Sequence, residues 1–417
     1  MSEVWFLTSG LEGDHASSFR QERWCRVFLE SGATIAIFNV RGALSLNEYS
    51  FATLDAFGAF REQAMANAPR VSSVRTGFPA RLLRRIKHMF LVDLYLPNVI
   101  RLLLRTMTRL RQTTGQVTIM ASSPPFSVAV VGALLKTLFR ERITLVVDMR
   151  DAWALHPALR AGGRIKRIVE GIALKKADYL ATVSYGLADE FASCYGIRTR
   201  VMYNVATHYL DAKPAVTMDL TSLDPAISKD RLLLVYTGST PKGHYDVSSI
   251  VGGMVLLRRK FPSLADRVQL IFVGACDEIR REALRQKVDN DDLVFVGHVL
   301  HSTARSIQAS ADALIFLAHF GPNNCGVVST KLFEYLCLGK PFIPLSLHAN
   351  SDVDRLLARY CGQTLHAHSS DEIASALAAI VQDGVGTLPR LTNPERVREL
   401  VIDYNKFACE LVSTQSP

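Results

Sequence analysis

The chain has 417 residues, of which 48% are hydrophobic and 21% are charged, and its formal net charge is +9. This length is too great for one comfortable hydrophobic core and predicts two domains, and the composition excludes a disordered chain. No apolar run is long enough to span a bilayer, and seven cysteines without Cys-x-x-Cys spacing favour reduced thiols over disulfides or a zinc site.

Strand-like and helical segments alternate through the first half of the chain. The predicted strands are Val4–Thr8, Thr34–Val40, Thr118–Ser122, Thr144–Asp148, Tyr179–Val183 and Val201–Tyr203. The predicted helices are Ser18–Leu29, Phe78–Leu110, Val128–Phe139, Arg164–Lys175 and Gly186–Ser193. Such alternation predicts a parallel sheet covered on both faces. Because Glu3 stands where a signal peptide carries positive charge, we expect a cytoplasmic protein.

A basic and apolar stretch lies within this half, from Arg75 to Arg111. It sets nine cations against one acid, Asp93: Arg75, Arg81, Arg84, Arg85, Lys87, Arg101, Arg105, Arg109 and Arg111. Basic and apolar faces at helical spacing predict a peripheral contact with an anionic membrane surface. The alternative is a helical insertion whose arginines are merely solvated. Nucleic-acid binding is not expected, because no aromatic ladder or helix-turn-helix pattern accompanies the charge.

The residue composition changes after Asn204, where prolines and many Thr, Ser and Asp residues predict a linker. A second alternation follows, with strands at Leu232–Thr237, Gln269–Val273, Leu293–Val296, Ala313–Leu317 and Phe342–Leu345. The end of the chain, from Pro394 to Val412, is predicted to be helical. The predicted division is residues 1–207, a linker at 208–229, a second domain at 230–393 and a closing segment at 394–417.

The most informative segment reads FGPNNCGVVSTKLFEYLCLGKP, from Phe320 to Pro341. A helix is predicted to begin at Ser329 or Thr330 and to end at Gly339. Lys331 and a helix N-terminus form an anion site, and the carboxylate of Glu334 can accept two hydrogen bonds from a vicinal diol. These features predict a seat for a ribose diphosphate. The alternative is an ordinary crossover helix with a solvated Lys331–Glu334 ion pair.

A second phosphate-binding candidate follows the strand Leu232–Thr237. Gly238 and Ser239 can bring backbone N–H groups close to a phosphate, and Lys242 adds a positive charge. Ligands bind at the carboxyl ends of such strands. A tight turn without a ligand is the alternative.

The segment STKLFEYLCLGKP resembles the nucleotide-sugar-binding helix of GT-B glycosyltransferases in the glycosyl transferases group 1 superfamily. The resemblance implies two Rossmann-like α/β domains facing a cleft, with the C-terminal helix returning to the N-terminal domain. It implies that Glu334 binds the ribose hydroxyls beside Thr330 and Lys331, and that Lys242 neutralises the departing diphosphate. It also implies that backbone groups of His298 and Val299 face the nucleobase. Val327 stands where the commoner family form has another glutamate near the donor sugar.

The first half carries the acceptor-side candidates. Val147 to Trp153, VDMRDAW, resembles the D-x-R-D-x-W motif of one branch of this superfamily, with Asp148 and Arg150 expected as a buried pair. Asp151 is the candidate general base if the enzyme inverts stereochemistry, and orients the acceptor if it retains. The loop after the first strand resembles a family loop at the cleft, and its candidate residues are Gly13, Asp14, His15 and Arg20. A capping aspartate and a surface histidine are the alternative.

Together these patterns predict a glycosyltransferase that moves a sugar from a nucleoside-diphosphate sugar to an acceptor hydroxyl, without a metal or cofactor. A lipid-linked or growing surface glycan is the expected acceptor. The alternatives are a nucleotide-sugar 2-epimerase of the same fold and a non-catalytic protein that binds sugar nucleotides or a membrane surface.

Overall fold

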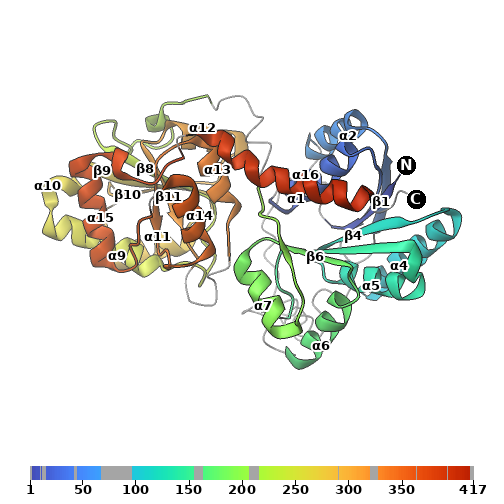
Figure 1. Cartoon of the computed structure of the whole chain (residues 1–417). Coiled ribbons are helices and arrows are strands. Elements are labelled where there is room, and N and C mark those ends of the chain that lie inside the picture. The colour runs from blue at the N-terminus through green and yellow to red at the C-terminus, as the bar shows by residue number, and fades with distance from the viewer. Residues whose placement is uncertain are drawn as a thin grey trace. The chain divides into compact units, whose positions relative to one another are not determined.

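The computed structural model describes residues 2–9, 11, 16–41, 45–66, 96–154, 163–205, 216–289, 291–319, 327–362, 364–391 and 393–413. The chain divides into two compact units. One unit comprises Met1–Val205 together with Glu399–Pro417, and the other comprises Ala206–Arg398 (Figure 1).

The first unit is built on a seven-stranded sheet of order β3-β2-β1-β4-β5-β6-β7. The strands are β1 Glu3–Thr8, β2 Thr34–Arg41, β3 Ser45–Phe51, β4 Val117–Ser123, β5 Ile143–Met149, β6 Tyr179–Thr182 and β7 Arg200–Val201. All pairs are parallel except β2 with β3, an antiparallel edge that the sequence patterns did not predict.

Helices cover both faces of this sheet, because its central strands are apolar on both sides. One core contains side chains of α4 Leu96–Gln112, α5 Ser127–Leu138 and α6 Gly163–Leu174. The opposite core contains side chains of α1 Ala16–Glu30 and α2 Leu54–Ala66. Helix α7, Tyr185–Tyr195, starts at the Ser184 cap. The predicted helix Phe78–Leu110 is seen from Leu96 onward, and its earlier part lies outside the described residues.

The closing helix α16, Arg398–Ser413, completes the core beside α1. Tyr404, Phe407 and Leu411 form its buried stripe, as the spacing of an amphipathic helix requires. The rings of Trp24 and Tyr404 lie 4.5 Å apart, centre to centre.

The second unit holds a five-stranded parallel sheet of order β10-β9-β8-β11-β12. The strands are β8 Leu232–Thr237, β9 Val268–Val273, β10 Leu293–Gly297, β11 Ala313–Leu317 and β12 Phe342–Leu345. The helices are α9 Val247–Lys260, α10 Pro262–Ala265, α11 Asp277–Gln286, α12 His301–Ser310, α13 Thr330–Leu338, α14 Asp352–Cys361 and α15 Ser370–Asp383. The prediction of two parallel α/β domains is confirmed.

Candidate functional site

The carboxyl edge of the second sheet has a reversal of strand order between β8 and β11. Strands β9 and β10 extend the sheet beyond β8, and β12 extends it beyond β11. In open α/β sheets, ligands bind outside the carboxyl ends of the strands at such a reversal. Gly238 follows β8 and α13 follows the loop after β11, so both predicted phosphate-binding segments belong to this edge.

Gly238 brings the loop after β8 against the side chain of Lys331. Its φ of +143° favours glycine, and a Cβ atom at this position would overlap the Nζ and Cε atoms of Lys331. The Lys331 ammonium lies 3.5 Å from Tyr236 Oη and 5.2 Å from the centre of that ring. The structure therefore places a glycine turn and a lysine from α13 in direct contact.

The Lys331 ammonium is poorly compensated. Burial lowers the pKa of Lys331, and the charge of Glu334 acts in the opposite direction. No ion pair joins Lys331 to a carboxylate in the described part of the chain. The side chain of Ser329 caps α13 by accepting from Lys331 N–H at 3.4 Å, and Thr330 is the first helical residue. An anion at this helix start would supply the missing counter-charge.

Glu334 is half-buried on the same helix, and within the described ranges its carboxylate has no hydrogen-bond or ion-pair partner. The predicted alternative, a direct Lys331–Glu334 ion pair, is not formed. The opposite face of α13 is apolar and consists of Leu332, Phe333, Tyr335 and Leu336. Cys337, near the end of the helix, is half-buried. Glu334 is thus positioned to accept hydrogen bonds from a ligand.

The expectation that Gly238 and Ser239 both offer backbone N–H groups to a phosphate is only half correct. The Gly238 N–H is not bare, because it donates to Val273 O at 2.8 Å, and Thr240 N–H donates to Ala275 O at 2.9 Å. Between them, Ser239 is exposed and its N–H has no acceptor among the described residues. The turn therefore offers the Ser239 N–H, not two adjacent N–H groups.

Lys242 lies further along the same loop and is exposed. No described side chain pairs with its ammonium. Lys331, rather than Lys242, is the lysine held against the turn.

His319 is a candidate that the sequence patterns did not identify. Its ring lies 5.7 Å from the ring of His244 and 5.2 Å from that of Tyr245. Burial, with smaller effects of His244 and Lys331, lowers the pKa of His319 to about 4. The position of His319 just after the strand Ala313–Leu317 was a usable signal, because ligand-contacting residues gather at carboxyl strand ends.

The predicted nucleobase loop follows β10. His298 is exposed and Val299 is half-buried. The preceding Gly297 accepts a hydrogen bond from Gly274 N–H at 2.6 Å, and a Cβ atom on Gly274 would overlap the Gly238 carbonyl. The turns of Gly297, Gly274 and Gly238 therefore adjoin along this edge, and they connect the loop of His298 to the loop after β8.

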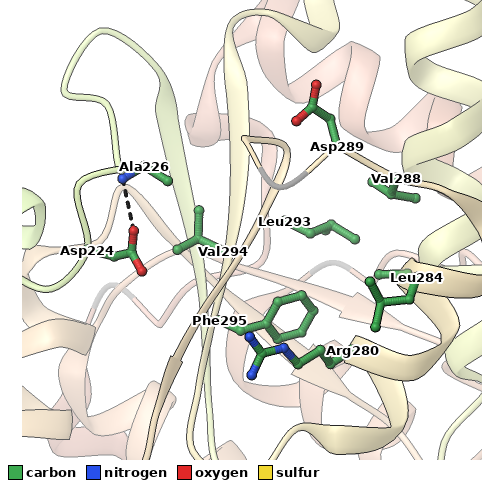
Figure 2. Close-up of a pocket in the computed structure, with 10 residues that line it drawn as sticks. Asp224, Ala226, Arg280, Leu284, Val288, Asp289, Leu293, Val294 and Phe295 are labelled. Atoms are coloured by element: carbon green, nitrogen blue, oxygen red, sulfur yellow. Dashed lines mark hydrogen bonds between the residues drawn. The ribbon is translucent and has the colours of Figure 1, made fainter.

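Another hollow in this unit is a pocket of about 380 Å³ between α11 and β10 (Figure 2). Phe295 and Arg280 lie next to each other in its lining, with the guanidinium 5.7 Å from the ring centre. None of the phosphate-binding or acceptor-side candidates contributes to this pocket, so it plays no part in the proposed site.

In the first unit, Arg20 and Asp148 form a buried ion pair with an Nη2–Oδ1 distance of 2.5 Å. Asp148 also accepts from Ser122 Oγ at 3.1 Å and Trp24 Nε1 at 3.3 Å. Two expectations are therefore wrong. Arg20 cannot face an acceptor, because its side chain is fully buried, and the partner of Asp148 is Arg20 rather than Arg150.

Arg150 instead donates to the carbonyl oxygens of Ser123 and Pro124. Asp151, the next residue, is exposed at the carboxyl end of β5, and no described residue pairs with its carboxylate. Glu170 of α6 holds the loop by accepting from Trp153 N–H at 2.9 Å. Asp151 is thus presented to solvent by a braced loop.

Gly13, Asp14 and His15 lie outside the described residues. In the described ranges, no three His, Cys, Asp or Glu side chains gather as a metal site would require. No helix found there has the length and apolar character needed to cross a membrane.

Comparison with known proteins gives similarity at the level of structure. No family model and no curated protein sequence matches the chain. The OtsA apo structure is similar over 100% of this chain and 99% of its own, with a TM-score of 0.61 and 10% identity. The α,α-trehalose 6-phosphate synthase of Burkholderia multivorans matches over 99% and 94%, with a TM-score of 0.60 and 10% identity. The UDP-GlcNAc 2-epimerase of Neisseria meningitidis bound to UDP-GlcNAc matches over 99% and 100%, with a TM-score of 0.50 and 11% identity.

These neighbours, together with the two parallel sheets, define a GT-B glycosyltransferase-like fold. At such low identities the similarity establishes the fold alone.

Proposed function

We propose that this chain is a glycosyltransferase that transfers a sugar from a nucleoside-diphosphate sugar to an acceptor hydroxyl. The observation that carries the proposal is the contact between Lys331 and the Gly238 turn, one helical turn before the unpaired carboxylate of Glu334. The cation and the backbone N–H match a diphosphate, and the carboxylate matches a ribose diol. The comparison with an epimerase bound to UDP-GlcNAc supports a sugar nucleotide as ligand.

Catalysis in this proposal comes from charge at the leaving group. As the glycosidic bond breaks, negative charge grows on the nucleoside diphosphate, and a positioned ammonium stabilises it. Lys331 supplies this charge from a half-buried site, and the exposed Lys242 adds to it. The reaction proposed here uses no divalent metal and no organic cofactor.

The acceptor is proposed to meet Asp151. If the reaction inverts stereochemistry, the Asp151 carboxylate removes the proton of the acceptor hydroxyl, and if it retains, Asp151 orients the acceptor. A lipid-linked or growing surface glycan on the cytoplasmic face of a membrane is the proposed acceptor class.

A nucleotide-sugar 2-epimerase is the second candidate, and His319 favours it. Epimerisation needs groups that move protons at the sugar, and a neutral imidazole beside Lys331 is such a group. Incubating the protein with UDP-GlcNAc alone separates the two candidates. An epimerase converts the sugar without any acceptor, whereas a transferase releases nucleoside diphosphate, and does so faster when an acceptor is added.

The ribose assignment is tested by calorimetry with a panel of nucleoside diphosphates. Glu334→Ala should weaken the best ligand about 10- to 150-fold, which corresponds to a loss of about 1.5–3 kcal/mol for a hydrogen bond to a charged group. The 2′-deoxy form of the same nucleotide should bind poorly to the wild type. The matched control is Glu62→Ala, since Glu62 is an exposed glutamate on α2 without a described partner.

Lys331→Met should weaken binding of the diphosphate more than Lys242→Ala does, because only Lys331 lies against the turn. Equal affinity of wild type and Glu334→Ala would contradict the ribose assignment. Failure of every nucleoside diphosphate to bind would contradict the proposed function itself.

A further inference from the structure

The helices α4, α5 and α6 belong to the first unit (Figure 1), and they expose apolar and basic side chains. Helix α5 packs against both others, and all three turn their buried sides to one core. Of the 14 exposed large hydrophobic residues in the described part of the chain, seven lie on these helices: Ile100, Leu104, Leu134, Leu138, Ile165, Ile168 and Ile172. We call this the α4–α6 face.

Helix α6 is the most pronounced part of the α4–α6 face. Ile165, Ile168 and Ile172 are 73%, 61% and 59% exposed, and their spacing places them on one side of the helix. Arg164 and Arg167 are exposed beside them; no described side chain pairs with Arg164, and Arg167 interacts electrostatically with Glu170. Isoleucines held in water at helical spacing indicate a surface that is covered when it functions.

The charge of the α4–α6 face is of one sign. Along all three helices the only acidic residue is Glu170, which is buried, whereas Arg101, Arg105, Arg109, Arg111, Lys136, Arg164, Lys166 and Arg167 are basic. Some of these are neutralised, since Glu48 pairs with Arg105 and Arg109. Exposed cations nevertheless remain, namely Arg111 on α4 and Arg164 with Arg167 on α6.

We propose that the α4–α6 face docks on an anionic lipid bilayer, with the isoleucines of α6 in the interface and the arginines at the phosphate groups. An amphipathic helix that is basic and apolar on its exposed side binds such a surface both by burying apolar area and by electrostatic attraction to the anionic lipids. A second copy of the chain fits less well, because a symmetric contact would set the same cations against each other. Residues 67–95 of this chain are also basic, so they would be repelled in the same way.

This inference differs from the sequence prediction in its location. That prediction used residues 75–111, whereas the exposed isoleucines on α6 come from a later part of the chain. The proposal also stands apart from the nucleotide site, because that site belongs to the other unit.

The test uses the full chain and sedimentation with vesicles. One set is phosphatidylcholine alone, and in the other set part of it is replaced by phosphatidylglycerol. We expect the wild type to sediment with the anionic vesicles and to be released by salt. Arg164→Glu with Arg167→Glu should lower the partition coefficient by more than about thirtyfold, because two contributions of about 1 kcal/mol are lost and each new carboxylate is itself repelled by the anionic lipid.

The matched charge control is Arg259→Glu with Arg267→Glu, two exposed arginines of the second unit that should leave binding unchanged. Replacing Ile165, Ile168 and Ile172 by Gln should also weaken binding. All three side chains are exposed, so the fold should survive, as circular dichroism can check.

The apolar control is Leu284→Gln with Leu300→Gln, at exposed leucines of the second unit. Equal sedimentation of the Arg164/Arg167 variant and the wild type would overturn the proposal. So would a wild-type dimer in sedimentation velocity that the isoleucine variant loses while neither protein binds vesicles. That result would assign the face to self-association.

Discussion

The buried ion pair of the first unit allows a stability prediction with a definite size. Arg20 and Asp148 have no exposed side-chain surface, and α1, β5 and α16 meet around them. Removing one partner of a buried pair leaves an uncompensated charge and costs about 3–5 kcal/mol. We expect both Arg20→Met and Asp148→Asn to lower the free energy of unfolding of this unit by that amount.

Tryptophan fluorescence in urea is a suitable assay, because all three tryptophans of the chain, Trp5, Trp24 and Trp153, lie in the first unit. We take a dependence of the unfolding free energy on urea of about 3 kcal/mol/M, the upper end of the range for small proteins. The midpoint of unfolding should then fall by roughly 1–1.7 M urea. The control is Arg26→Met on the same helix. Arg26 is 38% exposed and pairs with Glu22, and an exposed pair contributes about 0–1 kcal/mol.

The double variant Arg20→Met/Asp148→Leu removes both charges, so it should lose less stability than the sum of the two single changes. Some loss should remain, because Ser122 Oγ and Trp24 Nε1 would lose their acceptor. If Arg20→Met unfolds at the wild-type midpoint, the pair is not structural and the reasoning is refuted. An acceptor role for Arg20 would then have to be reconsidered.

Three further outcomes are expected. Gly238→Ala should abolish nucleoside-diphosphate binding in calorimetry, because its Cβ displaces the side chain of Lys331. The control Gly243→Ala, also at positive φ but with open space around it, should bind normally. Equal binding by both variants would contradict the proposed site. Burial lowers the pKa of His319 from 6.5 to about 4, so the free energy of unfolding should decrease as pH falls through this window. In urea unfolding followed by circular dichroism, His319→Gln should reduce this dependence on pH, whereas His298→Gln should not. Asp151→Asn should leave donor binding intact and slow transfer to an acceptor more than donor hydrolysis, and transfer at the wild-type rate would remove Asp151 from the proposal.

Local patterns predicted much of the second unit. The strands Leu232–Thr237, Ala313–Leu317 and Phe342–Leu345 appear with the expected bounds, because each is an apolar run ended by Gly, Pro or a polar loop. Helix α13 begins after its Ser329 cap for a similarly local reason. Strand β3 was not predicted, since its residues are half-exposed and it forms an antiparallel edge that only pairing with β2 creates.

By itself, the sequence determined the two α/β alternations, the glycine turn after β8 and the capped start of α13, because hydrophobic period, caps and glycines act over a few residues. Partners across the chain were decided only by the tertiary structure. Arg20, which the sequence pattern placed among the loop candidates, is a buried partner of Asp148. The position of His319 after a strand could be predicted, but its packing against the rings of His244 and Tyr245 could not. Exposure of the α6 isoleucines has the same origin: a helix shows its apolar residues in sequence, but the sheet and neighbouring helices decide which of them water still reaches.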